Sequence, residues 1–238
     1  MIPNMHNTKK FEEIDNLLDD QRNEQAYGLL RQQMTTADPA HKYQVMWRLA
    51  RSCFQASAEL ASNNPKRKEL LYKGKECAHE ALQLNENDFN GLKWAAVVHG
   101  SLDEFLSMKA RIENGHTFKG YLDKAIALQP KDFSLLHMRG RFSYSVAGLS
   151  WIERNFASTF FETPPTATYQ DAVNDLLEVN KIKMDWIDNL FYLAKSYIRL
   201  GDKANAAKYL KLASIVQPSD DADREVLKEV TQLMKKYK

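Results

Sequence analysis

Apolar side chains recur three and four positions apart along most of this chain, which is the spacing of one face of an α-helix. The pattern is clearest between residues 187 and 220, where two short helices are expected. The apolar positions of the first are Leu190, Leu193, Ala194 and Tyr197, and those of the second are Ala206, Leu210 and Ala213. Between them, Gly201 tolerates the positive φ at which many helices end, and Asp202 can cap the next helix. This stretch therefore predicts a helix–turn–helix unit that ends at Pro218.

The last eight residues of this unit have counterparts elsewhere in the chain. ALQLNEND begins at Ala81 and AIALQPKD begins at Ala125, and a weaker copy begins at Leu176. Helix pairs that repeat every 34 residues or more, with small residues where the helices meet, are typical of tetratricopeptide repeats, which are stable only when stacked. We therefore predict an all-α, tetratricopeptide-like solenoid of antiparallel helix pairs, formed as a single domain over 1–238. Its expected parts are a partial leading repeat at 1–39, about four long repeats at 40–88, 89–132, 133–183 and 184–220, and a capping helix at 221–238.

Composition narrows the function classes. The 33 basic and 31 acidic residues give a net charge of only +2, which offers no general argument for nucleic acid as a partner. The sequence contains neither a secretory signal nor an apolar run long enough to span a bilayer. Cys53 and Cys77 lie on apolar faces without the spacing of metal ligands, so we expect two buried, reduced thiols in an intracellular protein.

Catalytic motifs are incomplete. Glu76 and His79 have the spacing of one half of a helical di-metal site, but the second half is missing. Gly115 and Gly120 have phosphate-loop spacing without the Lys-Ser/Thr that binds nucleotide. His99 has no companion nucleophile or ligand in the sequence. We therefore expect a protein that is not an enzyme and holds no metal or cofactor.

The first helices of the repeats, which line the concave side of such a solenoid, carry cations at matching positions. The predicted groove residues are Arg48, Lys93, His137, Arg141, Lys195 and Arg199, with Asp188 as the local acid. A groove of fixed cations suits an extended acidic peptide, because arginine binds carboxylates through a fork of donors and lysine acts as a point charge. Basic patches on the outer surface are the alternatives. One contains Lys66, Arg67, Lys68, Lys73 and Lys75, and the other is the tail with Lys235, Lys236 and Lys238.

Two segments interrupt the repeat pattern. The first covers residues 100–120, and the second covers residues 140–172, where aromatic side chains are expected to pack against small residues. The second segment contains Gly140-Arg141-Phe142, Leu149-Ser150-Trp151 and Pro164-Pro165-x-x-x-Tyr169. With these motifs, the chain resembles the regulator of microtubule dynamics family over roughly residues 47–218. The signature residues of this segment are Phe142, Trp151, Phe160, Phe161, Pro164, Pro165 and Tyr169.

The resemblance implies a microtubule-associated protein of the cytoplasm and cytoskeleton that acts at spindles and spindle poles in chromosome segregation. The glutamate-rich tails of tubulin would then be the acidic peptides. Some relatives carry an N-terminal membrane anchor, and their repeat domain is credited with lipid binding. Since no such anchor is visible here, the cytoskeletal role is favoured. The alternatives are a phospholipid-binding or transfer module, with an apolar site under residues 142–161, and a scaffold for the acidic peptide of another protein.

Overall fold

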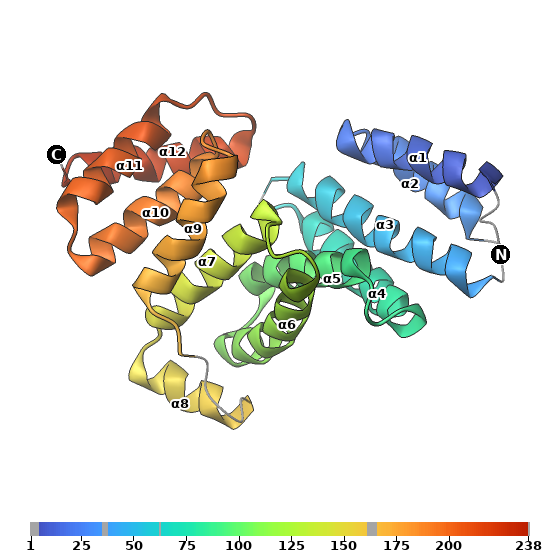
Figure 1. Cartoon of the computed structure of the whole chain (residues 1–238), viewed down its shortest axis with the longest axis horizontal. Coiled ribbons are helices and arrows are strands. Elements are labelled where there is room, and N and C mark those ends of the chain that lie inside the picture. The colour runs from blue at the N-terminus through green and yellow to red at the C-terminus, as the bar shows by residue number, and fades with distance from the viewer. Residues whose placement is uncertain (1–4, 35–37, 62, 161–165, 238) are drawn as a thin grey trace. The chain divides into compact units, whose positions relative to one another are not determined.

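The structure is a computed structural model that describes residues 5–34, 38–61, 63–160 and 166–237. Helices are the only regular elements in these ranges, so the all-α prediction is confirmed. They form two compact units, Met1–Leu128 and Gln129–Lys238, which we call unit 1 and unit 2 (Figure 1). That the repeats form one domain stays a prediction.

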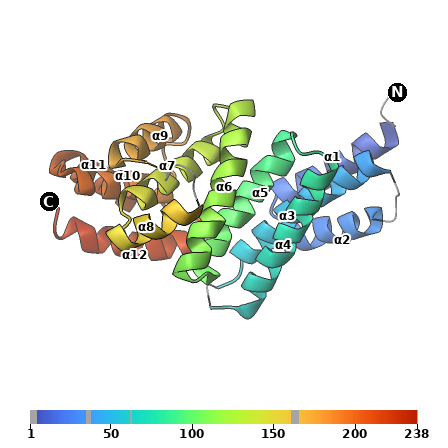
Figure 2. The same cartoon turned by 90° about the horizontal axis from the view of Figure 1, so that it is seen from below.

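Unit 1 is built from consecutive helices that pack in pairs. Its helices are α1 (Met5–Asp19), α2 (Asn23–Gln33), α3 (Pro39–Ala58), α4 (Pro65–Leu84), α5 (Phe89–Leu102), the 3-10 helix η1 (Asp103–Phe105) and α6 (Met108–Leu128). The pairs are α1 with α2, α3 with α4, and α5 with α6, and α3 also packs on α2 and α5 (Figure 2). The core of the leading pairs combines Ile14 and Leu18 of α1 with Leu30 of α2 and with the apolar face of α3.

Unit 2 repeats the arrangement with one additional helix. Its helices are α7 (Phe133–Ala147), α8 (Trp151–Phe160), α9 (Tyr169–Ile182), α10 (Ile187–Leu200), α11 (Lys203–Ile215) and α12 (Asp221–Met234). Helices α7 and α9 form one pair, α10 and α11 form the next, and α12 packs on α10 and α11. The predicted capping helix therefore covers this end of the core with Val230, which is fully buried.

The final aspartate of the repeated octapeptide caps the helix that follows. Asp88, Asp132 and Asp220 each precede a helix and accept a hydrogen bond from a backbone N–H in its first turn, at 2.9, 3.0 and 2.7 Å. These bonds satisfy N–H groups that have no partner inside the helix. The sequence repeat therefore marks the ends of the second helices and the starts of the helices that follow.

The turn between α10 and α11 has the geometry expected from the sequence. Gly201 has a φ of +79°, in the left-handed region that favours glycine. The side chain of Asp202 accepts a hydrogen bond from the backbone N–H of Asn205 at 3.0 Å. Both predictions for this turn are confirmed.

The two interrupting segments become helix. Residues 100–120 form the end of α5, η1 and the first part of the 21-residue helix α6. In the second segment, the prediction that the aromatic side chains pack against small residues is wrong for Trp151, which is 76% exposed. Helix α8 is tied to the end of α7 by Arg154 instead, which donates to the carbonyls of Val146 and Ala147. The side chain of Phe160, and Phe161, Pro164 and Pro165 as a whole, lie outside the described residues.

Both cysteines are free and buried, Cys53 on α3 and Cys77 on α4. Burial raises the pKa of Cys53 to about 12 and that of Cys77 to about 11. Because the thiolate is the reactive form, these residues are inert packing groups at neutral pH.

Candidate partner-binding site

Four of the predicted groove residues lie on two helices of unit 2. His137 and Arg141 are one turn apart on α7, and Lys195 and Arg199 are one turn apart on α10. The register that aligned the first helices in the sequence therefore places these residues as two neighbouring pairs within this unit.

Asp188, at the start of α10, links the two helices. Its Oδ2 atom accepts hydrogen bonds from His137 Nε2 and from Arg141 Nη1, each at 3.0 Å. Burial alone would raise the pKa of Asp188, but the hydrogen bond from His137 and the positive charges of Arg141 and Lys195 outweigh it, so the pKa lies below its ordinary value. Asp188 is therefore an ionised counter-ion for the cations around it.

His137 is a structural residue that joins three helices. It is 3% exposed, and its Nδ1 atom lies 3.1 Å from Asn189 Oδ1. The amide group of Asn189 donates to the Leu176 carbonyl on α9, so its Oδ1 atom is the acceptor that faces His137. Both ring nitrogens of His137 therefore lie against oxygen atoms of α10 side chains.

Lys195 lies among three aromatic rings. Its Nζ atom is 4.8 Å from the ring centroid of Phe191, 5.0 Å from that of Tyr192 and 5.4 Å from that of Tyr144. Burial lowers the pKa of Lys195, while the charges of Glu229 and Asp188 raise it in part. The ammonium group makes cation–π contacts but no hydrogen bond or ion pair within the part of the chain that the structure describes.

Arg199 is exposed at the next turn of α10. Its Nε atom donates to the Tyr169 hydroxyl at 2.7 Å, and the ring of Tyr169 packs on that of Tyr144 with centroids 5.4 Å apart. The tyrosines thus fix the cations in position. We call this surface the cationic–aromatic face and define it by Arg141, Tyr144, Tyr169, Tyr192, Lys195 and Arg199.

The other two predicted groove residues belong to unit 1. Arg48 is 6% exposed and binds Asp15 through two hydrogen bonds, of 2.8 and 2.6 Å, that tie α3 to α1. Its guanidinium also lies 4.0 Å from the ring centroid of Trp47. Buried in this way, Arg48 presents no surface to a partner. Lys93 is half-buried, with its Nζ atom 5.6 Å from the ring centroid of Phe89.

Basic side chains of the outer patches lie beside acidic ones. Arg67 pairs with Glu104 at 2.9 Å and Lys73 pairs with Glu76 at 3.4 Å, while Lys68 lies over the ring of Tyr72. The other described members of these patches are Lys66, Lys75, Lys235 and Lys236, and Lys238 lies outside the described residues. Exposed ion pairs of this kind are typical of a solvated helix face.

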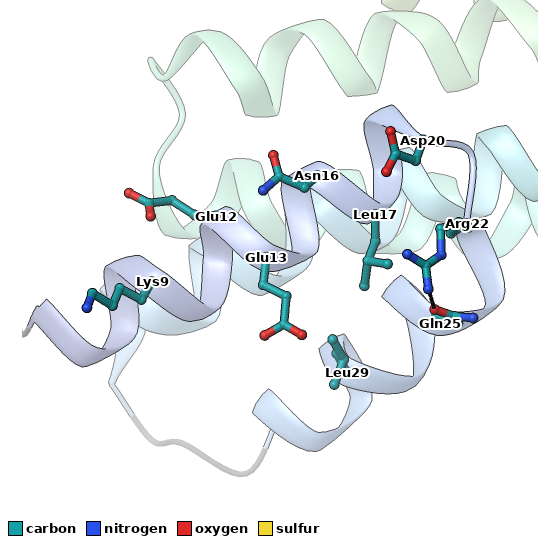
Figure 3. A pocket seen from close by; sticks show the side chains of 9 residues that line it. All are labelled: Lys9, Glu12, Glu13, Asn16, Leu17, Asp20, Arg22, Gln25 and Leu29. Atoms are coloured by element: carbon teal, nitrogen blue, oxygen red, sulfur yellow. Dashed lines mark hydrogen bonds between the residues drawn. The ribbon is translucent and has the colours of Figure 1, made fainter.

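An open pocket of about 630 Å³ lies between α1 and α2 (Figure 3). Its lining mixes both signs of charge, from Lys9 and Glu13 of α1 to Arg22, which donates to Gln25 at 2.6 Å. None of the predicted site residues lines it. In the described ranges, no three potential metal ligands cluster together.

Comparison with known proteins decides the family. The match to "Regulator of microtubule dynamics protein 1-3" covers residues 10–238. The chain belongs to this family. It is 34% identical to regulator of microtubule dynamics protein 1 of Caenorhabditis elegans over 81% of this chain and 84% of that protein. It is 31% identical to protein 1 of Pongo abelii over 98% of this chain and 74% of that protein.

Solved structures share the fold of this family member but little of its sequence. A thermophilic TPR protein of Thermus thermophilus superposes with a TM-score of 0.60 at 15% identity, over 95% of this chain and 99% of that one. A mutant of MamA superposes with a TM-score of 0.54 at 13% identity, over 90% of this chain and 98% of that one. The predicted tetratricopeptide-like fold is confirmed. Among the described residues, none of the helices has the length and apolar character needed to cross a bilayer.

The signature segment of the family contributes to the cationic–aromatic face through Tyr169, while Phe142 is half-buried on α7. Sequence reasoning missed Tyr144 and Tyr192, which hold the cations. A signal for them exists, because each tyrosine lies three residues from a predicted groove cation, Arg141 or Lys195, and so shares its helical face.

Proposed function

We propose that this chain is a non-enzymatic protein of the cytoskeleton that binds microtubules and regulates their dynamics, through acidic tubulin segments bound at the cationic–aromatic face. In this proposal it acts in the cytoplasm at spindles and spindle poles during chromosome segregation. The support at the level of the family is the name that its relatives carry. The support at the level of the site is the surroundings of Lys195.

Lys195 carries the proposal because its ammonium group makes no direct hydrogen bond or ion pair among the described residues, although the charges of Glu229 and Asp188 act on it. An ammonium group that is partly removed from water loses solvation, and this is normally offset by a hydrogen-bonded anion. The rings of Tyr144, Phe191 and Tyr192 offer only cation–π contacts. A carboxylate from a partner would supply the missing acceptor, and Arg199, one turn away, would offer its remaining donors to a second one.

The site can be tested by co-sedimentation with microtubules. Lys195→Glu places a negative charge among the aromatic rings, and we expect it to weaken binding by about tenfold. Lys211→Glu is the matched control, because it makes the same charge change at an exposed position of α11 outside the face. Equal binding by the two variants, with helicity retained in both, would remove the cationic–aromatic face from the proposal.

Microtubules stripped of the tubulin tails separate the remaining alternatives. Loss of binding to them supports an acidic tail as the ligand. Undiminished binding would leave the face to an acidic peptide of another protein. The phospholipid alternative gains no support from the described residues, since Trp151 and Ile152 of α8 are exposed instead of lining an apolar site.

A further inference from the structure

The two cations of α10 are spaced like alternate side chains of an extended peptide. Lys195 and Arg199 are four residues apart on one helix, which separates them by about 6 Å along its axis. In an extended chain, side chains two residues apart lie on the same side and are separated by about 6.7 Å. An extended ligand lying along α10 can therefore present one carboxylate to each cation if its acidic residues alternate with other residues.

Asp188 makes the two ends of the cationic–aromatic face different. Its Oδ2 atom already binds Arg141 at 3.0 Å, whereas the Lys195 ammonium forms no ion pair or hydrogen bond with a described carboxylate, although the charges of Glu229 and Asp188 act on it. A ligand carboxylate that approached Arg141 would have to displace Asp188 or lie beside it, and like charges repel at such distances. Among the described residues, neither Lys195 nor Arg199 is paired directly with a carboxylate, whereas Arg141 is.

We propose that the cationic–aromatic face binds an extended acidic peptide whose acidic residues alternate with other residues. Lys195 and Arg199 each bind one carboxylate of this peptide, and Asp188 keeps a third carboxylate from binding to Arg141. This inference rests on the proposed function and adds the spacing of the ligand and the residue that limits its affinity. Asp188 is a specificity-determining residue in this scheme, since it decides how many carboxylates the face accepts.

Synthetic peptides test the spacing directly. Fluorescent peptides with blocked ends and equal composition carry two glutamates in a glycine–serine background, either adjacent or separated by one or by three residues. Fluorescence anisotropy with the full chain is expected to give the lowest Kd for a separation of one residue, by about threefold over the others. Equal affinities for all the spacings would overturn the inference and leave the proposed function intact, whereas no binding of any acidic peptide would overturn both.

Asp188→Asn tests the built-in anion. Asparagine keeps the size of the side chain and can still accept the hydrogen bond from His137, but it removes the charge that screens Arg141. A peptide with three alternating glutamates should bind this variant about threefold more tightly than it binds the wild-type chain. Unchanged or weaker binding by a folded Asp188→Asn chain would overturn the role given to Asp188.

Asp175→Asn is the matched control for this variant. Asp175 of α9 also pairs with an arginine of α7, Arg139, at 2.7 Å, so the substitution removes an arginine's carboxylate and makes the same charge change elsewhere in unit 2. It should leave the affinity for the peptide unchanged. An equal gain in both variants would mean that overall charge, and not Asp188, sets the affinity, which also overturns the inference. If Asp188→Asn does not fold, the peptide spacing series on the wild-type chain decides.

Discussion

His99 lies inside unit 1 as a neutral base, with both ring nitrogens engaged. Asn114 donates its amide hydrogens to the His99 carbonyl and to Asp103, so its Oδ1 atom accepts from His99 Nδ1 at 2.6 Å. His99 Nε2 is then the acceptor for His79 Nε2, 2.9 Å away. Burial is the main cause that lowers the pKa of His99 to about 4.

The pKa of His99 predicts a loss of stability in mild acid. As the pH falls below about 6.5, His99 takes up a proton in the unfolded chain, whereas in the folded chain it stays neutral until about pH 4. The free energy of unfolding therefore falls between these two pH values. Between about pH 7 and about pH 5 the loss should be about 2 kcal/mol, measured by urea denaturation. His99→Gln should flatten this dependence. Identical slopes in wild type and His99→Gln would contradict this assignment.

At the scale of single residues, the sequence predicted which helix face a side chain occupies better than which residue it contacts. The helical register identified Arg141, Lys195 and Arg199 as residues of one surface, and the structure places them on neighbouring helices of unit 2. The same register also selected Arg48, whose partner Asp15 lies 33 residues away on another helix. Helical periodicity reports which face a side chain occupies, but a contact between distant helices depends on packing that periodicity does not encode.

Gly140 on α7 lies close to α9. A Cβ atom added there would lie 2.8 Å from Leu176 Cγ and 3.3 Å from the Ala172 carbonyl oxygen, so the two helices would have to move apart. Gly140→Ala should therefore lower the free energy of unfolding by about 1 to 3 kcal/mol. Gly120→Ala is the opposite case, because no atom lies within 4 Å of the added Cβ, and it should raise stability by up to about 1 kcal/mol. Urea denaturation of both variants checks the signs, and a neutral Gly140→Ala would show that α7 and α9 can separate at no cost.

At the scale of helices, sequence signals were reliable where the cause is local. The cap at Asp202, the turn at Gly201 and the capping helix α12 each follow from a few neighbouring residues, and each is present. The segment around α8 was less predictable. Its aromatic residues were expected to pack against small residues, but composition does not say which face of a helix is covered, and Trp151 is 76% exposed.

For binding to a polyanion, the local arrangement of charged side chains matters more than the net charge of the whole molecule. A net charge of +2 gives almost no attraction to a polyanion in general, and the charges of the outer patches are partly offset by neighbours such as Glu76 and Glu104. Binding through the cationic–aromatic face would therefore involve few cations, whereas binding through the outer patches would involve many. The salt dependence of binding reports how many cations take part.

Salt titration of microtubule binding separates these two cases. Each cation that neutralises a single-stranded nucleic acid contributes about −0.7 to the slope of log K against log salt, and with the same value for an acidic tail Lys195 and Arg199 together predict a slope of roughly −1.4. Between about 50 and about 200 mM salt, roughly a fourfold change, the affinity should then fall by about sevenfold. Lys195→Gln should make the slope shallower by about half, and Lys211→Gln should leave it unchanged. A wild-type slope near about −4 would require about six cations, more than the face contains, and would assign the contact to the outer patches, because screening acts on every exposed charge that takes part.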